Sequence, residues 1–277
     1  MPTPPLLELR HLTKTYPNVA ALDDFSLAVQ KEEIHALLGE LGAGKTTLLR
    51  ILAGIHPHGA FAGEVVLEGQ VMQFHGPADA IRAGISVVPR RLGLFEQLSV
   101  AENIVMGRWE HQNRFFIRTV EVHKQAQAAL DMLHLHLPLD ARVGQLSPIQ
   151  QRLLMIARAV STHPRLVVLD EPTTNLATAE AVSQLLYAVR RLPALGMTCL
   201  YLSRRLNDAA QVGDRLTIVR DGKAAGTYDR EGYNEAEMAR AMVSQRLGDI
   251  EHIDVDEKGE GGGGLTGLWR SMFSPKR

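Results

Sequence analysis

The chain has a single cysteine, no long apolar run and almost no net charge, and each of these absences narrows what it can be. The one cysteine, Cys199, excludes a disulfide within the chain and fits a reducing compartment. Its place in the apolar run Thr198 to Leu202 makes it most simply a small buried hydrophobic residue. No apolar stretch approaches the ~20 residues that a membrane-spanning helix requires. The N-terminal M-P-T-P-P also lacks the basic and apolar regions of a signal peptide. We therefore expect a soluble protein whose role at a membrane, if it has one, is peripheral.

The charge balance gives no general reason to expect a nucleic-acid partner. Lys and Arg total 30 and Asp and Glu total 31, which leaves a net charge of −1. This total does not exclude local patches of basic residues. With 277 residues the chain can bury a sizeable core and would ordinarily form one large or two modest domains.

One stretch, Gly39 to Thr47, reads G-E-L-G-A-G-K-T-T and fits the phosphate-binding loop pattern of Gly, four residues and Gly-Lys-Thr. It lies between the apolar run 34–38 and the helix-like run 47–53. Glycines let backbone N–H groups close around phosphate oxygens, and the following helix points its positive end at the same anion. Lys45 can reach the β- and γ-phosphates, and the Thr46 hydroxyl is placed to ligate Mg²⁺. The nucleotide-binding residues that we expect are Gly39, Glu40, Leu41, Gly42, Ala43, Gly44, Lys45, Thr46 and Thr47. The alternative is a chance Gly-rich turn between a strand and a helix.

Apolar periodicity predicts alternating strands and helices, which implies a parallel sheet. The expected strands are 6–14, 21–29, 33–38, 63–67, 85–88, 165–169, 198–202, 215–220 and 223–227. The expected helices are 77–83, one that begins at the capping box of Ser99, and 120–133, 147–160, 178–192, 205–211 and 235–243. Asp221-Gly222 predicts a hairpin turn. The mostly helical middle, about residues 99–161, looks like a subdomain inserted between strands.

A second chemical signal lies about 125 residues after the loop lysine, where an apolar strand ends in Asp170 and Glu171. In a nucleoside triphosphatase, a carboxylate at the strand end holds the Mg²⁺ shell, and its neighbour polarises the attacking water. We therefore expect Asp170 as a metal ligand and Glu171 as the catalytic base. The alternative, a surface D-E-P-T turn, is common in isolation.

Together these motifs resemble the ATP-binding cassette family, and more narrowly the first nucleotide-binding cassette of monosaccharide import ATPases of the xylose and ribose type. The narrower resemblance rests on K-T-Y-P-N-V-A-A-L-D-D-F-S-L (residues 14–27), G-I-H-P-H-G-A-F-A-G-E (54–64), the run 84–104 and D-R-L-T-I-V-R-D-G (214–222). It covers roughly residues 6–242. The resemblance implies an α/β P-loop NTPase fold: a RecA-like core with a parallel sheet, N-terminal antiparallel strands and the inserted helical subdomain. It also implies that Tyr16 stacks on adenine, although a tyrosine at a strand end is usually just packing.

Several positions depart from the family pattern. Arg90 stands where the family has a glutamine that touches Mg²⁺ and the attacking water, and Arg204 stands where it has a histidine that contacts the γ-phosphate. Both arginines can hold phosphate, but neither reproduces the geometry that positions water. Smaller departures are Leu41, where the family usually has Asn, and Thr174 to Ala177 in the loop that communicates across the dimer.

The family signature L-S-G-G-Q, or L-S-x-G-Q in the sugar branch, reads L-S-P-I-Q here, over Leu146 to Gln150. The resemblance implies that Ser147 binds nucleotide. Ser147 can still cap the helix that follows, and Pro148 is well suited to the first position of that helix. Proline removes one N–H, and Ile149 puts a branched side chain where glycine lets backbone approach phosphate. The residues that the fold requires are therefore kept, whereas those that would act in catalysis across the dimer are replaced.

The leading hypothesis is the ATP-binding subunit of an ABC importer for a monosaccharide, which binds ATP and Mg²⁺ with impaired hydrolysis. Its expected partners are a second cassette, as a homo- or heterodimer, membrane permease subunits and, indirectly, a periplasmic sugar-binding protein, with no nucleic acid. Its expected location is the cytoplasmic face of the inner membrane. One alternative is a non-hydrolysing regulatory or scaffolding cassette. Another is a soluble cassette of translation or DNA repair, whose usual second cassette or long insertions are not visible here.

We expect residues 1–245 to form the nucleotide-binding domain and 246–277 to form a Gly-rich linker with a short amphipathic tail. That tail either touches a partner or membrane surface, or is an incidental terminus. The sugar-importer family typically fuses two cassettes, whereas this chain holds one. A natural single-cassette subunit, a truncated gene product and an engineered piece all stay open.

Overall fold

The structure, a computed structural model, describes residues 4–17, 19–106, 119–232 and 235–242. The expected linker and amphipathic tail, 246–277, lie outside these ranges. Within them, no helix combines the length and the apolar character needed to span a bilayer.

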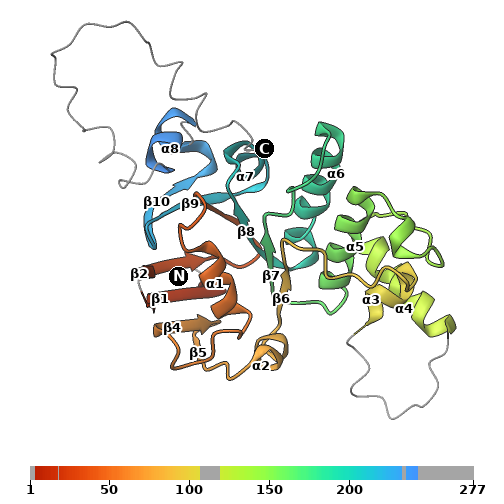
Figure 1. The fold of residues 1–277 in the computed structure, drawn as a ribbon, viewed down its shortest axis with the longest axis horizontal. Helices are drawn as coiled ribbons and strands as arrows, with labels where there is room; N and C mark the ends of the chain where they lie inside the picture. Colours follow the sequence, from red (N-terminus) through yellow and green to blue (C-terminus); the bar gives the residue numbers. More distant parts are fainter. Residues whose placement is uncertain (1–3, 18, 107–118, 233–234, 243–277) are drawn as a thin grey trace, which may run out of the picture. The chain divides into compact units, whose positions relative to one another are not determined.

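The larger of two β-sheets carries the phosphate loop (Figure 1). Its six strands are β3 (Ile34–Leu38), β6 (Ile85–Val88), β7 (Leu166–Asp170), β8 (Thr198–Ser203), β9 (Arg215–Arg220) and β10 (Lys223–Asp229). The strand order is β10-β9-β3-β8-β7-β6, and all pairs are parallel except the hairpin of β9 and β10. Asp221 and Gly222 both have positive φ in that hairpin, as the predicted turn requires. The predicted parallel sheet is confirmed.

The strands of a smaller antiparallel sheet come before and after the phosphate loop in the sequence. Its strands are β1 (Leu7–Tyr16), β2 (Val19–Val29), β4 (Ala62–Leu67) and β5 (Gln70–Met72), in the order β2-β1-β4-β5. The predicted antiparallel N-terminal strands are confirmed. β5 is a strand that the sequence did not predict, because it has only three residues and follows directly on the tight turn at Glu68 and Gly69, both with positive φ.

Eight helices are described: α1 (Lys45–Leu52), α2 (Pro77–Arg82), α3 (Val100–Val105), α4 (Thr119–Met132), α5 (Pro148–Val160), α6 (Ala179–Arg190), α7 (Leu206–Val212) and α8 (Glu235–Met242). Short 3₁₀ helices cover Val143–Gln145, Pro193–Leu195 and Arg230–Gly232. Figure 1 shows α3, α4 and α5 gathered beside β6 and β7, the strands between which they are inserted. Ser99 forms the predicted capping box at α3, and Ser147 caps α5 with Pro148 at its first position.

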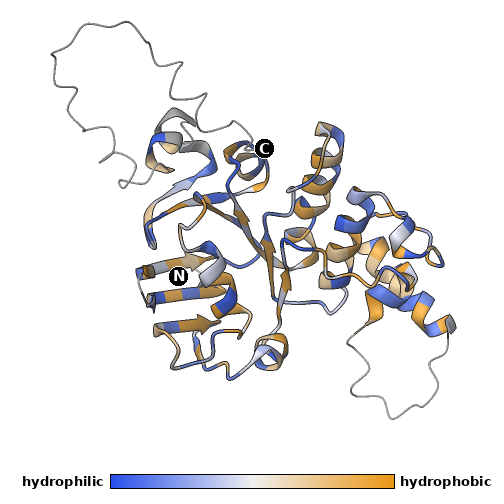
Figure 2. Cartoon of the chain, in the orientation of Figure 1, coloured by the Kyte–Doolittle hydropathy of each residue, from blue (hydrophilic) through white to orange (hydrophobic). Residues whose placement is uncertain are grey.

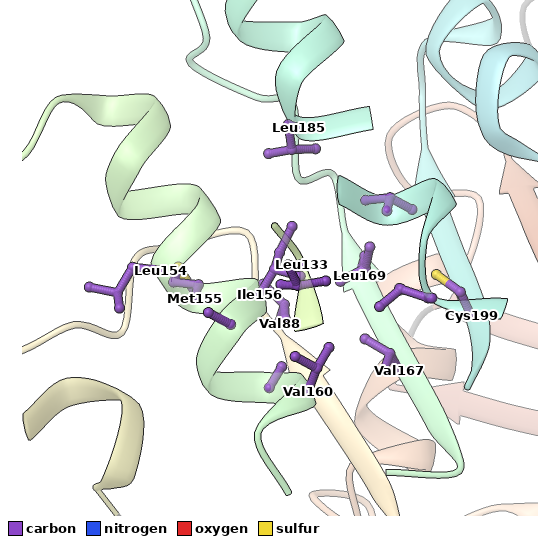
Figure 3. Close-up of a cluster of buried hydrophobic side chains, with 14 of the residues drawn as sticks. Val88, Leu133, Leu154, Met155, Ile156, Val160, Val167, Leu169, Leu185 and Cys199 are labelled. Atoms are coloured by element: carbon purple, nitrogen blue, oxygen red, sulfur yellow. The ribbon is translucent and has the colours of Figure 1, made fainter. Parts of the chain in front are cut away.

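A buried apolar cluster joins the inserted helices to the parallel sheet (Figure 3). Met155 and Ile156 of α5 pack with Val88 of β6 and Leu169 of β7, and Cys199 of β8 lies in the same cluster, fully buried as predicted. Figure 2 shows the central strands as continuous hydrophobic segments, the pattern of a parallel sheet covered on both faces. This core fixes α5 against β7, the strand that ends in Asp170.

Candidate functional site

The phosphate-loop sequence folds as a tight turn between β3 and α1. Glycine is required at two of its positions by space, and at one of them, Gly44, also by backbone angle. Gly44, with φ 108°, directly precedes α1, and a Cβ there would overlap the carbonyl oxygen of Ala21. A Cβ on Gly39 would overlap the carbonyl oxygen of Val219. The loop therefore packs directly against the backbones of β2 and β9.

Lys45 is the first residue of α1, and its side chain folds back over the loop. Its Nζ donates to the carbonyl oxygens of Gly39 and, at 3.0 Å, of Glu40. Burial lowers the pKa of Lys45 to about 8; the nearby Glu171 carboxylate opposes this, and the Arg204 guanidinium adds to it. The ammonium is therefore held in place by the loop but lacks a full counter-charge.

The loop bounds a cavity of about 260 Å³. Its walls are Glu40, Leu41, Gly42, Ala43, Gly44, Lys45, Thr46 and Thr47 of the loop and α1, Val19 and Ala21 of β2, and Arg90, Asp170 and Glu171. Leu41 is 79% exposed at the rim. Residues from four distant parts of the sequence thus surround one space beside the N-terminus of α1, where a negative ligand is favoured.

Asp170 and Glu171 reach this cavity from the end of β7. Burial, with the adjacent negative charge of Glu171, raises the pKa of Asp170, and the Lys45 ammonium partly offsets the rise. Glu171 is buried and has φ 45°, a left-handed conformation that glutamate adopts at a cost. Its N–H donates to the carbonyl of Leu202 at 2.9 Å, which ties this conformation to β8. Such strain is typical of functional positions.

The Glu171 carboxylate is shared between two guanidinium groups. Arg204 Nε lies 2.8 Å from Glu171 Oε1, and Arg90 Nε lies 3.4 Å from Glu171 Oε2. The Thr174 hydroxyl also donates to Oε2 at 3.2 Å. Both carboxylate oxygens therefore have cationic partners. The sequence placed these three residues in one site but did not predict that the two arginines would pair with the glutamate itself.

Three residues that the sequence assigned to nucleotide binding are not among those that line the cavity: Gly39, whose place in the loop is described above, Tyr16 and Ser147. Tyr16, at the end of β1, bonds through its hydroxyl to Nε2 of His56 at 2.8 Å, and the Lys14 ammonium lies 5.4 Å from its ring centre. Ser147 lies at the start of α5, where its hydroxyl accepts from the Gln150 N–H. His56 is a site neighbour that the sequence did not signal, since no motif connects it with Tyr16.

A family model described as ABC transporter matches residues 22–174, more than half of the chain, and this span contains the loop, Asp170 and Glu171. The chain belongs to the ABC transporter family. The family resemblance predicted from the sequence is therefore confirmed.

Curated relatives agree with the narrower resemblance. The xylose import ATP-binding protein XylG of Moorella thermoacetica is 36% identical over 242 residues, which are 87% of this chain and 48% of the relative. XylG of Escherichia coli O157:H7 is 37% identical over 244 residues, 88% of this chain and 47% of the relative. The chain thus spans about half the length of the curated relatives that it matches.

Solved structures share the fold of this cassette. A nucleotide-free ATP-binding cassette from an ABC transporter superposes with a TM-score of 0.72 at 24% identity, over 90% of this chain and 100% of that one. A dimeric cassette in a post-hydrolysis state bound to ADP and Pi superposes with a TM-score of 0.68 at 25% identity, over 82% and 100%. The P-loop NTPase fold predicted from the sequence, with its antiparallel and parallel sheets, is confirmed.

Proposed function

We propose that this cassette is the ATP-binding subunit of an ABC importer for a monosaccharide, and that it binds ATP more effectively than it hydrolyses it. The likeness to xylose import ATP-binding proteins supports the transport role. The cavity beside α1 supports nucleotide binding. The pairing of Glu171 with two arginines supports weak turnover, and it is the observation that carries the proposal.

The residues around the cavity fit a Mg²⁺-bound triphosphate. The loop N–H groups and the start of α1 would hold the phosphates, and the buried Lys45 ammonium would gain the counter-charge that it lacks. The exposed Thr46 hydroxyl and the Asp170 carboxylate would ligate Mg²⁺, which prefers one or two protein oxygens together with phosphate oxygens. The metal would neutralise phosphate charge. Tyr16, steadied by His56, would stack on the adenine, and Ser147 would contact nucleotide held by a second cassette.

Hydrolysis needs the Glu171 carboxylate to accept a hydrogen bond from water. Here the guanidinium groups of Arg204 and Arg90 contact both of its oxygens. A γ-phosphate carries more negative charge than a carboxylate, so its arrival would draw the arginines toward itself. They would then strengthen ATP binding, but they would remain close enough to compete with water for Glu171.

The working unit that we propose is a dimer of cassettes docked on permease subunits at the cytoplasmic face of the inner membrane, with a periplasmic sugar-binding protein acting indirectly. Residues 1–245 would form the cassette, with 99–161 as its helical subdomain. The dimeric relative bound to ADP and Pi supports the pairing. A partner cassette with an intact signature would complete the site at this chain's loop.

The same pairing favours a second function, a non-hydrolysing regulatory cassette gated by nucleotide. Measuring ATP binding and phosphate release in parallel separates the two. We expect ATP binding at micromolar to millimolar concentration, lost in Lys45→Ala, and slow phosphate release that Glu171→Gln abolishes. Turnover that Glu171→Gln leaves unchanged would favour the regulatory function, and a Lys45→Ala variant with wild-type affinity would overturn the binding claim.

A further inference from the structure

The turn between β9 and β10 lies directly against the phosphate loop, although the two are far apart in the sequence. The N–H of Gly222, in that turn, donates to the carbonyl oxygen of Ala43 at 3.1 Å. A Cβ on Gly44 would lie 3.5 Å from the Cα of Gly222. Ala43 and Gly44 both line the cavity beside α1. The turn therefore contacts the loop at the two residues that precede α1.

Gly222 also bonds to β2, which forms part of the cavity wall. Its carbonyl oxygen accepts from the Asp23 N–H at 3.0 Å. The Lys223 ammonium lies 3.0 Å from the Asp23 carboxylate and adds an exposed ion pair at the same place. One glycine thus holds Ala43 through its N–H and Asp23 through its carbonyl group. A shift of the loop relative to β2 would break one of these two bonds.

The chain contains a second turn of the same conformation that does not touch the loop. In the β9–β10 turn, Asp221 has φ 49° and Gly222 has φ 78°; in the β4–β5 turn, Glu68 has φ 49° and Gly69 has φ 79°. A Cβ on Gly222 would lie 3.0 Å from the carbonyl oxygen of Ala21, whereas a Cβ on Gly69 would meet nothing within 4 Å. The two glycines therefore share a backbone requirement and differ in their surroundings.

The bond from Gly222 fixes the orientation of one peptide unit of the phosphate loop. The unit between Ala43 and Gly44 has its C=O and N–H on opposite sides, as a planar trans peptide requires. Because Gly222 holds the C=O, it also sets the direction of the Gly44 N–H. Gly44 is the N-cap of α1, and N–H groups at a helix start have no partner within the helix.

We propose that Gly222 is a positioning residue for nucleotide binding, which orients the phosphate-binding N–H groups of the loop through the Ala43 carbonyl. The inference rests on the proposed binding of ATP at this loop. It adds a residue from the C-terminal hairpin that the loop motif does not contain. The phosphates of a nucleotide bind several N–H groups at once, so a small rotation of one peptide unit lowers affinity without removing any ligand group.

The test compares the ATP affinity of Gly222→Ala with that of Gly69→Ala in the full chain. Both changes place alanine at a positive φ, so both are expected to lower the melting temperature. ATP is titrated by calorimetry well below both melting transitions. We expect Gly222→Ala to bind ATP about fivefold more weakly than wild type, the equivalent of one typical hydrogen bond, and Gly69→Ala to bind it as wild type does. Equal affinity of the two variants would overturn the inference.

Hydrogen exchange of the loop amides, measured without nucleotide, separates this inference from the proposed function. We expect faster exchange over residues 39–47 in Gly222→Ala than in Gly69→Ala and wild type, because the loop loses its bond to the turn. A wild-type protein that does not bind ATP would count against the proposed function, and this exchange would still decide the role of Gly222. Loop exchange that is the same in the two variants would contradict that role.

A measurement on wild type alone covers the case in which Gly222→Ala does not fold. Coupling between two sites is reciprocal, so ATP bound at the loop must also stabilise the turn that orients it. We expect ATP to slow amide exchange at the β9–β10 turn and to leave the β4–β5 turn unchanged. Unchanged exchange at the β9–β10 turn in protein saturated with ATP would refute the inference.

Discussion

Releasing Glu171 from its two arginines is expected to raise ATP turnover. The contact of Arg204 with Glu171, at 2.8 Å, is a charge-assisted hydrogen bond to a buried carboxylate, but the Arg204 side chain is 42% exposed. Solvent screening of the exposed partner reduces its worth to about 2 kcal/mol. The Arg90 contact is longer, at 3.4 Å, and equally exposed, so we assign it about 1 kcal/mol.

These free energies convert to rates because a paired carboxylate must lose its partner before it can orient water. At about 1.4 kcal/mol for each tenfold change, Arg204→His is expected to raise the turnover number by about 30-fold and Arg90→Gln by about fivefold. The two contacts share one carboxylate, so their effects will not simply multiply in the double variant. Histidine and glutamine are chosen because both can still hydrogen-bond the γ-phosphate or the water.

The assay is phosphate release at saturating ATP and Mg²⁺, with ATP affinity measured on the same preparations. Glu171→Gln added to each variant must abolish the gain, which ties it to the carboxylate. Arg205→His is the matched control, because Arg205 neighbours Arg204 but lies 3.9 Å from Asp208 rather than on Glu171. A double variant that binds ATP normally and turns over no faster than wild type would refute the reasoning.

Three further predictions concern the phosphate loop and the start of α5. Since Lys45 has a pKa of about 8 in the free protein, its charged fraction falls about tenfold between pH 7 and pH 9, and ATP affinity should fall by a similar factor with uptake of protons near pH 8. Calorimetry in two buffers of different ionisation enthalpy measures that uptake, and binding without it would contradict the assignment. Gly44→Ala should lower the free energy of unfolding by roughly 1–3 kcal/mol, because Gly44 has a positive φ and a Cβ there would meet the Ala21 carbonyl oxygen. Thermal melting measures this loss. We expect the variant to lose ATP binding as well, which ATP titration measures. Ser147→Ala should lower the unfolding free energy by about 1 kcal/mol in urea denaturation, with no effect expected on the loop cavity.

The features that the sequence predicted are local. The phosphate loop, the caps of α3 and α5 and the D-E pair at the end of β7 each depend on residues within a few positions of one another. Their conformations follow from short-range rules on glycine, capping and apolar periodicity. The parallel pairing within the larger sheet follows almost as directly, because strands joined through helices pair in parallel. The expected elements therefore match the observed ones to within a few residues at most ends.

The features that the sequence missed are pairings between distant segments. Glu171 meets Arg204 because β7 and β8 are neighbours in the sheet and both end at the same edge. Tyr16 meets His56 across a similar gap in sequence. Glu171 and Arg204 are only one acidic and one basic residue in a chain with 30 basic and 31 acidic residues, so composition does not select them as partners. Backbone geometry selects them, including the left-handed conformation of Glu171.

The departures at positions 90 and 204 converge on one carboxylate and so are not independent losses. Each replaces a neutral or titratable family residue with a permanent cation, and each cation contacts a different oxygen of Glu171. Reverting one position therefore leaves a guanidinium on the carboxylate, and the strained Glu171 backbone remains held in place by the Leu202 carbonyl in either case. Under the proposed function, the charges of this site favour retention of phosphate, because the arginines that pair with Glu171 would be attracted to a triphosphate more strongly than to a carboxylate.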